Sequence, residues 1–279
     1  MLTSIEQVVT AALAEDAPWG DITSETFIPK NAQLSGRIIA REPGVFSGQA
    51  LFDASFRLVD PHIDISLEIN DGDTFDTGAV LGTITGSARS ILRAERIALN
   101  FIQRTSGIAT LTARYVAEAY GTKARIVDTR KTTPGLRIIE RQAVRDGGGF
   151  NHRATLSDAV MVKDNHLAAI ATQGLSITEA LRTMKAQLPH TTHVEVEVDR
   201  LEQIPPVLEA GVDTIMLDNF TTEDLVKGVE LIDGRAIVEA SGGVNLSTVG
   251  SIAATGVDVI SVGALTHSVH ALDLGLDIS

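Results

Sequence analysis

From about residue 123 onward, short apolar runs alternate with longer stretches of mixed polarity, repeating roughly every 20 to 35 residues. Runs rich in β-branched residues are typical of strands in a parallel sheet, and the stretches between them have helical spacing. The pattern therefore predicts repeated strand–helix–strand units. The six expected strands cover residues 124–128, 158–163, 193–198, 213–218, 236–240 and 258–263.

Helix starts are marked by capping residues. Ser176 and Glu179 have capping-box spacing at the start of an amphipathic stretch that ends near Leu188. Thr221 and Asp224 stand in a similar relation. Ser4 and Gln7 predict a further helix, through about Glu15.

The polar residues that end the six strands decide between an open sheet and a barrel. In parallel barrels, ligands bind at the carboxyl ends of the strands. Six strands fall short of eight, so we expect an α/β protein with an open, incomplete α/β barrel over residues 113–267. Residues 1–112, with alternating segments between 35 and 85, predict a separate α/β domain. The strand-end residues are Asp128, Lys163, Glu197, Asp218, Ser241 and Gly263.

Composition restricts the function. The 279 residues have no cysteine, which excludes disulfides, thiolate metal sites and a cysteine nucleophile. The net charge of −13 argues against nucleic acid or an anionic membrane as partner. No apolar run approaches a membrane span, and the N-terminus lacks the basic start of a secretory signal, so we expect a cytoplasmic protein.

Positive charge is concentrated in one segment. Residues 89–163 hold 14 Lys/Arg and 6 Asp/Glu, a net charge of +8, which leaves −21 for the remainder. Within it, "DTRKTTPGLR" places Arg130 and Lys131 directly after a strand, where two kinds of cation suit two anionic groups. A solvated basic turn is the alternative. The glycines of "GGGFNHR" allow close approach to a ligand and precede His152 and Arg153.

Further polar groups follow at the next strand ends. Lys163 ends an apolar strand and suits a phosphate contact, a Schiff base or a salt bridge to a neighbouring carboxylate. His193, Glu195 and Glu197 share one strand face. We interpret Glu195 as a structural hydrogen-bonding group, and Glu197 with Asp218 as ligands of Mg²⁺ or of sugar hydroxyls. A zinc site that includes His193 is poorly supported, because no second histidine ligand lies nearby.

Two glycine-containing loops, "EASGGVN" and "SVGALTH", follow the last two strands. Backbone N–H groups in such loops form phosphate sites. Cations, carboxylates and two phosphate loops together fit phosphoribosyl transfer, in which cations stabilise departing pyrophosphate and carboxylates hold ribose hydroxyls.

Nine segments of the chain resemble one family, in order and in spacing from about residue 15. They are "EDAPWGDITS", "ERIALNFIQRTSGIAT", "DTRKTTPGLR", "AVRDGGGFNHR", "VMVKDNH", "VEVEVDRLEQ", "IMLDNF", "EASGGVN" and "VGALTHS". This set is similar to the quinolinate phosphoribosyltransferases, also called nicotinate-nucleotide pyrophosphorylases. The resemblance implies a type II phosphoribosyltransferase: an N-terminal α/β sandwich, to which the tail of about residues 268–279 returns, and an open barrel.

The implied reaction converts quinolinate and phosphoribosyl pyrophosphate into nicotinate mononucleotide, pyrophosphate and CO₂, with Mg²⁺, in de novo NAD synthesis. Arg96 matches an arginine that the family donates to a neighbouring subunit, which implies a homodimer or a hexamer of dimers. Arg141 stands where relatives usually carry Lys, and its role and that of His267 stay open. By motif position, the resemblance implies that Arg130, His152, Arg153 and Lys163 bind quinolinate, and that Lys131, Glu197 and Asp218 bind the phosphoribosyl pyrophosphate and its metal, directly or through water. It also implies that Thr129 binds substrate, and that the 5′-phosphate is held by Ser241, Gly242, Gly243, Val262, Gly263 and Ala264. We expect Lys163, Glu197 and Asp218 to be catalytic.

Three alternatives remain at this level. One is a molybdenum-operon-linked pyrophosphorylase of the same architecture with another substrate. The second is a barrel aldolase that uses Lys163 as a Schiff base, and the third is a phosphate sensor without turnover.

Overall fold

The computed structural model describes residues 4–172 and 174–278, which divide into two compact units. The first unit contains residues up to 113, 132–148 and those from 265 onward, and the second contains 114–131 and 149–264. The expected boundary between 112 and 113 differs from this division mainly because residues 132–148 belong to the first unit. Among the described residues, no helix is both long and apolar enough to cross a membrane.

The first unit is built on an antiparallel sheet of order β12-β1-β5-β3. Its strands are β1 (Gln33–Ala40), β3 (Asp64–Leu67), β5 (Val80–Ser87) and β12 (Leu274–Ile278). A two-stranded sheet pairs β2 (Gly44–Val45) with β4 (Thr74–Phe75). The helices are α1 (Ile5–Asp16), α2 (Ile22–Phe27), α3 (Gln49–Arg57), α4 (Ala88–Glu118), α5 (Arg137–Asp146) and α11 (Ala264–His267), with the division between units falling inside α4 and within α11.

The tail of the chain forms the edge strand of this sheet. In β12, Leu276 pairs with Ile38 of β1, and the Arg41 guanidinium lies 2.8 Å from the Asp277 carboxylate. The core beside the sheet is mainly aliphatic but includes three fully buried aromatic rings, Phe46, Phe52 and Phe56.

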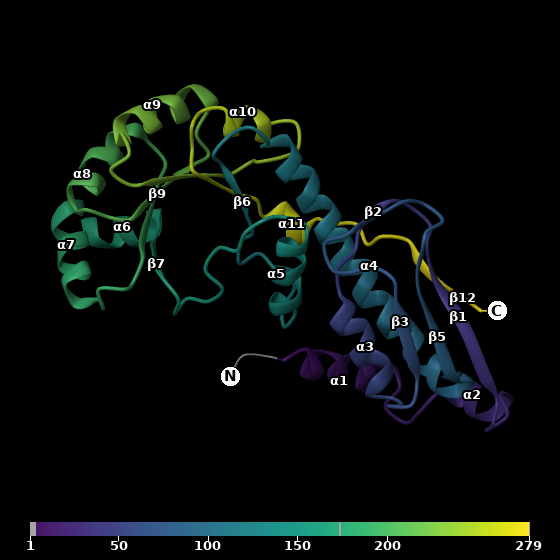
Figure 1. Cartoon of the computed structure of the whole chain (residues 1–279). Coiled ribbons are helices and arrows are strands. Elements are labelled where there is room, and N and C mark those ends of the chain that lie inside the picture. The colour runs from purple at the N-terminus through teal and green to yellow at the C-terminus, as the bar shows by residue number, and fades with distance from the viewer. Residues whose placement is uncertain (1–3, 173, 279) are drawn as a thin grey trace. The chain divides into compact units, whose positions relative to one another are not determined.

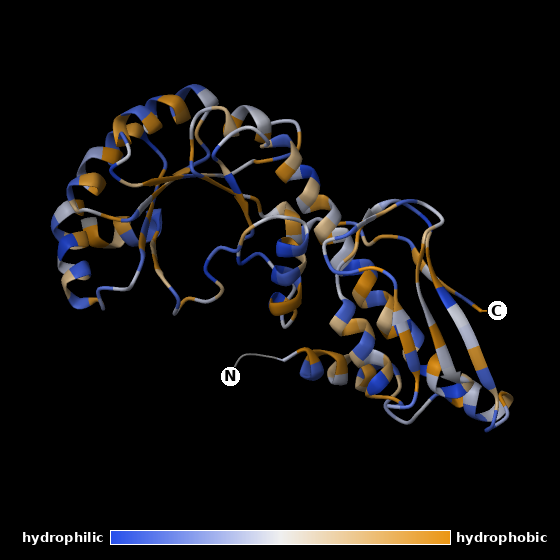
Figure 2. Cartoon of the chain, viewed as in Figure 1, coloured by the Kyte–Doolittle hydropathy of each residue, from blue (hydrophilic) through white to orange (hydrophobic). Residues whose placement is uncertain are grey.

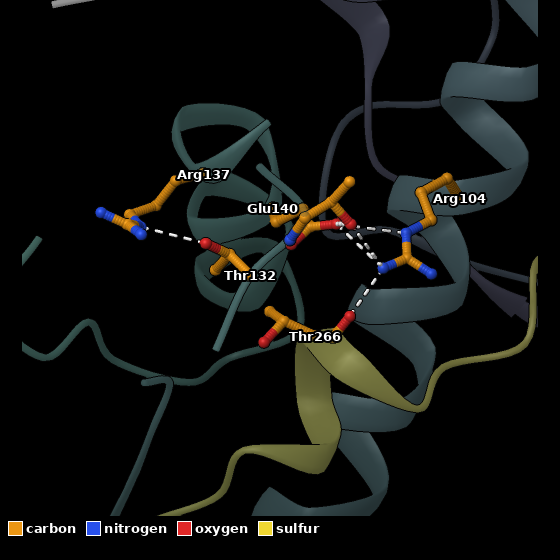
Figure 3. A network of polar contacts seen from close by, with 6 residues as sticks. Arg104, Thr132, Arg137, Glu140 and Thr266 are labelled. Carbon is orange, nitrogen blue, oxygen red and sulfur yellow. Dashed lines mark hydrogen bonds and ion pairs between the residues drawn. The ribbon is translucent and has the colours of Figure 1, made fainter. Parts of the chain in front are cut away.

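The first unit also contains a buried ionic network (Figure 3). The Glu140 side chain on α5 is fully buried, and its Oε1 lies 2.9 Å from Arg104 Nη2 of α4. Thr133 donates to both carboxylate oxygens, through Oγ1 at 2.7 Å and through its backbone N–H at 3.0 Å. Arg104 also donates to the Thr266 carbonyl at 2.6 Å. Both oxygens of Glu140 are therefore satisfied, as a buried charge requires.

The second unit is a parallel six-stranded sheet of order β6-β11-β10-β9-β8-β7. Its strands are β6 (Arg125–Val127), β7 (Val160–Val162), β8 (Val194–Val198), β9 (Thr214–Asp218), β10 (Ile237–Ser241) and β11 (Val259–Ser261), and its helices are α6 (Asp164–Ala171), α7 (Ile177–Gln187), α8 (Ile204–Glu209), α9 (Thr222–Ile232), α10 (Val249–Ala253) and the 3₁₀ helix η1 (Leu201–Gln203). All six expected strands are present, and β6 and β7 form the two edges of the sheet, which confirms the open barrel.

The helices of the second unit lie along the outer side of its curved sheet (Figure 1). Hydrophilic and hydrophobic residues alternate along them, whereas the strands carry long hydrophobic stretches (Figure 2). The predicted capping box of Ser176 and Glu179 is formed at the start of α7, and that of Ser4 and Gln7 at the start of α1. Local capping chemistry therefore gave the correct helix starts.

Candidate functional site

A cavity of about 460 Å³ lies in the second unit, at the carboxyl ends of the strands. It is lined by Thr129, Arg130, Lys131, His152, Arg153, Met161, Lys163, Glu197, Met216, Asp218, Glu239, Ser241 and Ser261. All six strands contribute, through residues within or at the ends of the strands or in the loops that follow. The cavity therefore occupies the position at which parallel barrels bind ligands.

The predicted cations meet in this cavity. Arg130 and Lys131 follow β6, Arg153 precedes β7, and Lys163 follows β7 as the N-cap residue of α6. Burial and the neighbouring charge of Arg130 lower the pKa of Arg153. Arg153 Nη1 donates to the Ala159 carbonyl at 3.0 Å, while its Nε is buried without a hydrogen-bond partner. Like charges held this close together suit a multiply negative ligand.

Two of the predicted carboxylates face the same cavity. Glu197 lies near the end of β8 and forms an ion pair with Lys163, one of the contacts expected for that lysine. Asp218 ends β9 and accepts a hydrogen bond from Asn219 Nδ2 at 2.7 Å. Mg²⁺ prefers one or two carboxylates together with substrate phosphates, so this oxygen donor pair fits the ion.

His152 lies between two buried acids. Its Nε2 is 3.1 Å from Glu195 on β8 and 3.4 Å from Glu239 on β10. Burial of the ring opposes its charged form, but the hydrogen bonds and charges of the two glutamates outweigh this and raise the pKa of His152 to about 10. Burial raises the pKa of Glu195, against the hydrogen bond from His152. The structural role expected for Glu195 thus has a definite partner.

The glycine-containing loops contribute less to the cavity than expected. Ser241 lines it, whereas the other predicted phosphate residues do not. Gly242 and Gly243 both have a positive φ, and a Cβ on Gly242 would meet Asn219 Oδ1 at 2.2 Å. The Val262 N–H donates to the Val127 carbonyl at 2.9 Å. The residues outside the cavity lining are Gly242, Gly243, Val262, Gly263 and Ala264.

Arg96 lies on α4 and is exposed. Four further cavity residues were not predicted from the sequence: Met161, Met216, Glu239 and Ser261. Glu239 had a usable signal, because it is two positions before Ser241 on the same strand and therefore shares its face. The two methionines had none, since in sequence they look like any other core residue.

The fold and the cavity define an α/β-barrel protein whose site is suited to small, multiply negative ligands. The chain belongs to the quinolinate phosphoribosyl transferase family, since the model of that family's N-terminal domain matches residues 21–106 and the model of its C-terminal domain matches residues 108–277.

Individual relatives agree over the full length. The chain is 38% identical to a probable nicotinate-nucleotide pyrophosphorylase [carboxylating] of Bacillus subtilis, covering 99% of this chain and 93% of that protein. It is 42% identical to the nicotinate-nucleotide pyrophosphorylase [carboxylating] of Mycobacterium leprae, covering 97% and 95%. The crystal structure of NadC from Streptococcus pyogenes has a TM-score of 0.94 at 39% identity, covering 100% of this chain and 98% of that one. These relatives support the family prediction over the three alternatives.

Proposed function

We propose that this protein transfers a phosphoribosyl group from phosphoribosyl pyrophosphate to quinolinate, releasing pyrophosphate and CO₂ and giving nicotinate mononucleotide. One observation carries the proposal: four basic side chains, three carboxylates and two methionines line the same cavity of about 460 Å³. Quinolinate is a flat ring with two adjacent carboxylates. It needs several cations and an apolar wall at once, and the cavity offers both.

The cations and acids have separate tasks in this reaction. Arg130, Arg153 and Lys163 hold the two carboxylates of quinolinate and orient its ring nitrogen toward C1 of the ribose. As the new N–C bond forms, the bond from C1 to pyrophosphate breaks. Lys131 stabilises the charge on the leaving group, and Glu197 and Asp218 hold the ribose hydroxyls and favour the positive sugar carbon.

Loss of CO₂ completes the reaction. The bond between C2 and its carboxylate breaks, CO₂ leaves, and the electron pair left on C2 is stabilised by the positive ring nitrogen. A proton from water then adds at C2. Glu197 and Asp218 are the residues that would hold Mg²⁺, which neutralises phosphate charge when bound.

Several wider expectations belong to the same proposal. We predict that Ser241 and the backbone of Gly242 and Gly243 contact the 5′-phosphate, that a second copy donates the exposed Arg96, and that the protein is cytoplasmic. Co-expressing the two impaired variants Arg96→Ala and Lys163→Ala should restore part of the activity, because mixed dimers then contain one intact site. No recovery would argue against a shared site.

One assay tests the central proposal. Purified protein is mixed with quinolinate, phosphoribosyl pyrophosphate and Mg²⁺, and nicotinate mononucleotide is measured. Nicotinate, which lacks the second carboxylate, serves as the control acid and should give no product. Product with another acid and none with quinolinate would refute the substrate, and borohydride trapping of Lys163 with a sugar would refute the class.

A further inference from the structure

Three side chains from separate parts of the second unit meet beside the cavity. His152 and Glu239 line the cavity, and Glu195 lies beside them but outside its lining. Both glutamates are nearly fully buried, with exposed fractions of 4% for Glu195 and 3% for Glu239. Removing two carboxyl groups from water costs free energy. Their shared contact with one imidazole nitrogen therefore needs an explanation.

The His152 ring has one defined orientation. The fully buried Asp128 accepts the His152 backbone N–H at 2.7 Å and the Asn151 side-chain amide at 2.8 Å, which anchors the loop. The Arg153 backbone N–H donates to Nδ1 at 2.7 Å. Nδ1 accepts this bond only in the neutral ring, whose proton is then on Nε2, and the charged ring also carries a proton there. Nε2 therefore faces the two glutamates with a proton in both charge states.

Both ring nitrogens of His152 are therefore used within the protein. What His152 offers a ligand is the edge and face of its ring. Two acceptors around one N–H fix the plane of that ring more firmly than one acceptor would. We propose that Glu195 and Glu239 are positioning residues, which hold His152 protonated on Nε2 with its ring fixed against the cavity, where it binds quinolinate.

The surrounding groups agree with a role in binding rather than in folding alone. One oxygen of each glutamate, Glu195 Oε1 and Glu239 Oε1, and the neighbouring cavity hydroxyl of Ser261 are buried without a hydrogen-bond partner. A purely structural network of buried polar groups normally has every atom paired. The other charges nearby are Arg153 on the same loop, Asp128 beneath it, and His193, which acts on Glu195.

A double-mutant cycle tests the proposal. Glu195→Gln and Glu239→Gln keep the shape of each side chain but remove its charge, and each should raise the KM for quinolinate roughly tenfold. The KM for phosphoribosyl pyrophosphate should change less than about twofold. In a His152→Asn background, neither substitution should have a further effect, because the group that they position is gone. Glu223→Gln, on the exposed face of α9, is the matched control and should leave both constants unchanged.

A spectroscopic measurement separates positioning from general damage. In protein labelled with ¹⁵N-histidine, the signal absent from His152→Asn identifies His152. At neutral pH it should show a hydrogen-bonded Nε2 proton, which exchanges faster with water in the double variant Glu195→Gln/Glu239→Gln. This readout needs no turnover. If quinolinate is not a substrate but the proton signal depends on the glutamates, the proposed function fails and the positioning role stands.

Two results would overturn the proposal. One is additive effects of the glutamate and histidine substitutions, because additivity means that the groups act independently. The other is stoichiometric binding of Zn²⁺ or Mn²⁺ to the wild-type protein that is lost in Glu239→Gln, because the three ligand atoms lie within 4.8 Å of one another and would then form a metal site.

Discussion

Each unit of this protein buries glutamate side chains, and the two cases differ in one respect. Glu140 of the first unit has hydrogen bonds to both oxygens, from Arg104 and Thr133. Glu195 and Glu239 of the second unit each have one oxygen without a partner. A complete set of partners is typical of a group that maintains the fold. An incomplete set beside a cavity is typical of a group whose environment is tuned for a ligand.

The largest change in stability is expected when the fully paired network around Glu140 is broken. Glu140→Ala leaves the partly exposed Arg104 without its ion-pair partner and Thr133 without its acceptor, and it should lower the free energy of unfolding by about 3 kcal/mol. Urea unfolding measures this loss. Glu68→Ala, at an exposed position of the first unit, is the control and should change the free energy of unfolding by less than about 0.5 kcal/mol. Equal losses in the two variants would show that the network contributes nothing.

Removing a cavity cation should lower activity and leave stability nearly unchanged. Lys163→Ala should lower kcat/KM for quinolinate about 100-fold, or about 2.7 kcal/mol of transition-state stabilisation, while the free energy of unfolding changes little. Steady-state kinetics with both substrates measures the change, and the exposed Lys30→Ala is the matched control. Normal turnover by Lys163→Ala would remove this residue from the mechanism.

The His152 cluster should also make stability depend on pH. Because the pKa of His152 is about 10 in the folded protein and near 6.5 when unfolded, its stabilising contribution is complete below about pH 6.5. It is lost as the pH rises toward about 10. Urea unfolding across this range should show a decline that is smaller in His152→Asn. Identical pH profiles for the two proteins would contradict the raised pKa.

Loss of a helix cap should give the smallest change in the free energy of unfolding, and the change should be of the same size in both units. Ser4 caps α1 and Ser176 caps α7, each in a reciprocal capping box. Ser4→Ala and Ser176→Ala should each lower the free energy of unfolding by about 1 kcal/mol, because each removes one hydrogen bond to the first turn. Urea unfolding of the two variants provides the comparison. A much larger loss for one cap would show that its helix end has a tertiary role as well.

Much of the fold is visible in the sequence because its signals are local. The six strands of the second unit are apolar runs of defined length, and the starts of α7 and α9 are set by Ser176 and Thr221. The assignment of residues 132–148 to the first unit is not visible in this way. It reflects long-range contacts such as that of Glu140 with Arg104, two residues that are 36 positions apart in sequence.

The cavity was predictable where chemistry and strand position coincide. Arg130, Lys163 and Asp218 are polar residues at strand ends, and the barrel brings strand ends together. The partners of His152 were not predictable, because Glu195 and Glu239 lie within strands, where alternation gives the face of the sheet but not the group that a side chain meets. Met161 and Met216 were missed because an apolar residue that contacts a ligand looks the same as one in the core.

The pairing of β12 with β1 has a consequence for biosynthesis. The strand that completes the sheet of the first unit comes from residues 274–278, whereas its neighbour is made from residues 33–40. During translation, the whole of the second unit therefore leaves the ribosome before β12 is available to pair with β1. Until then, that strand has one unpaired edge, which is a template for unwanted association. Nascent chains stalled before residue 274 should for this reason depend on chaperones more than the finished protein does.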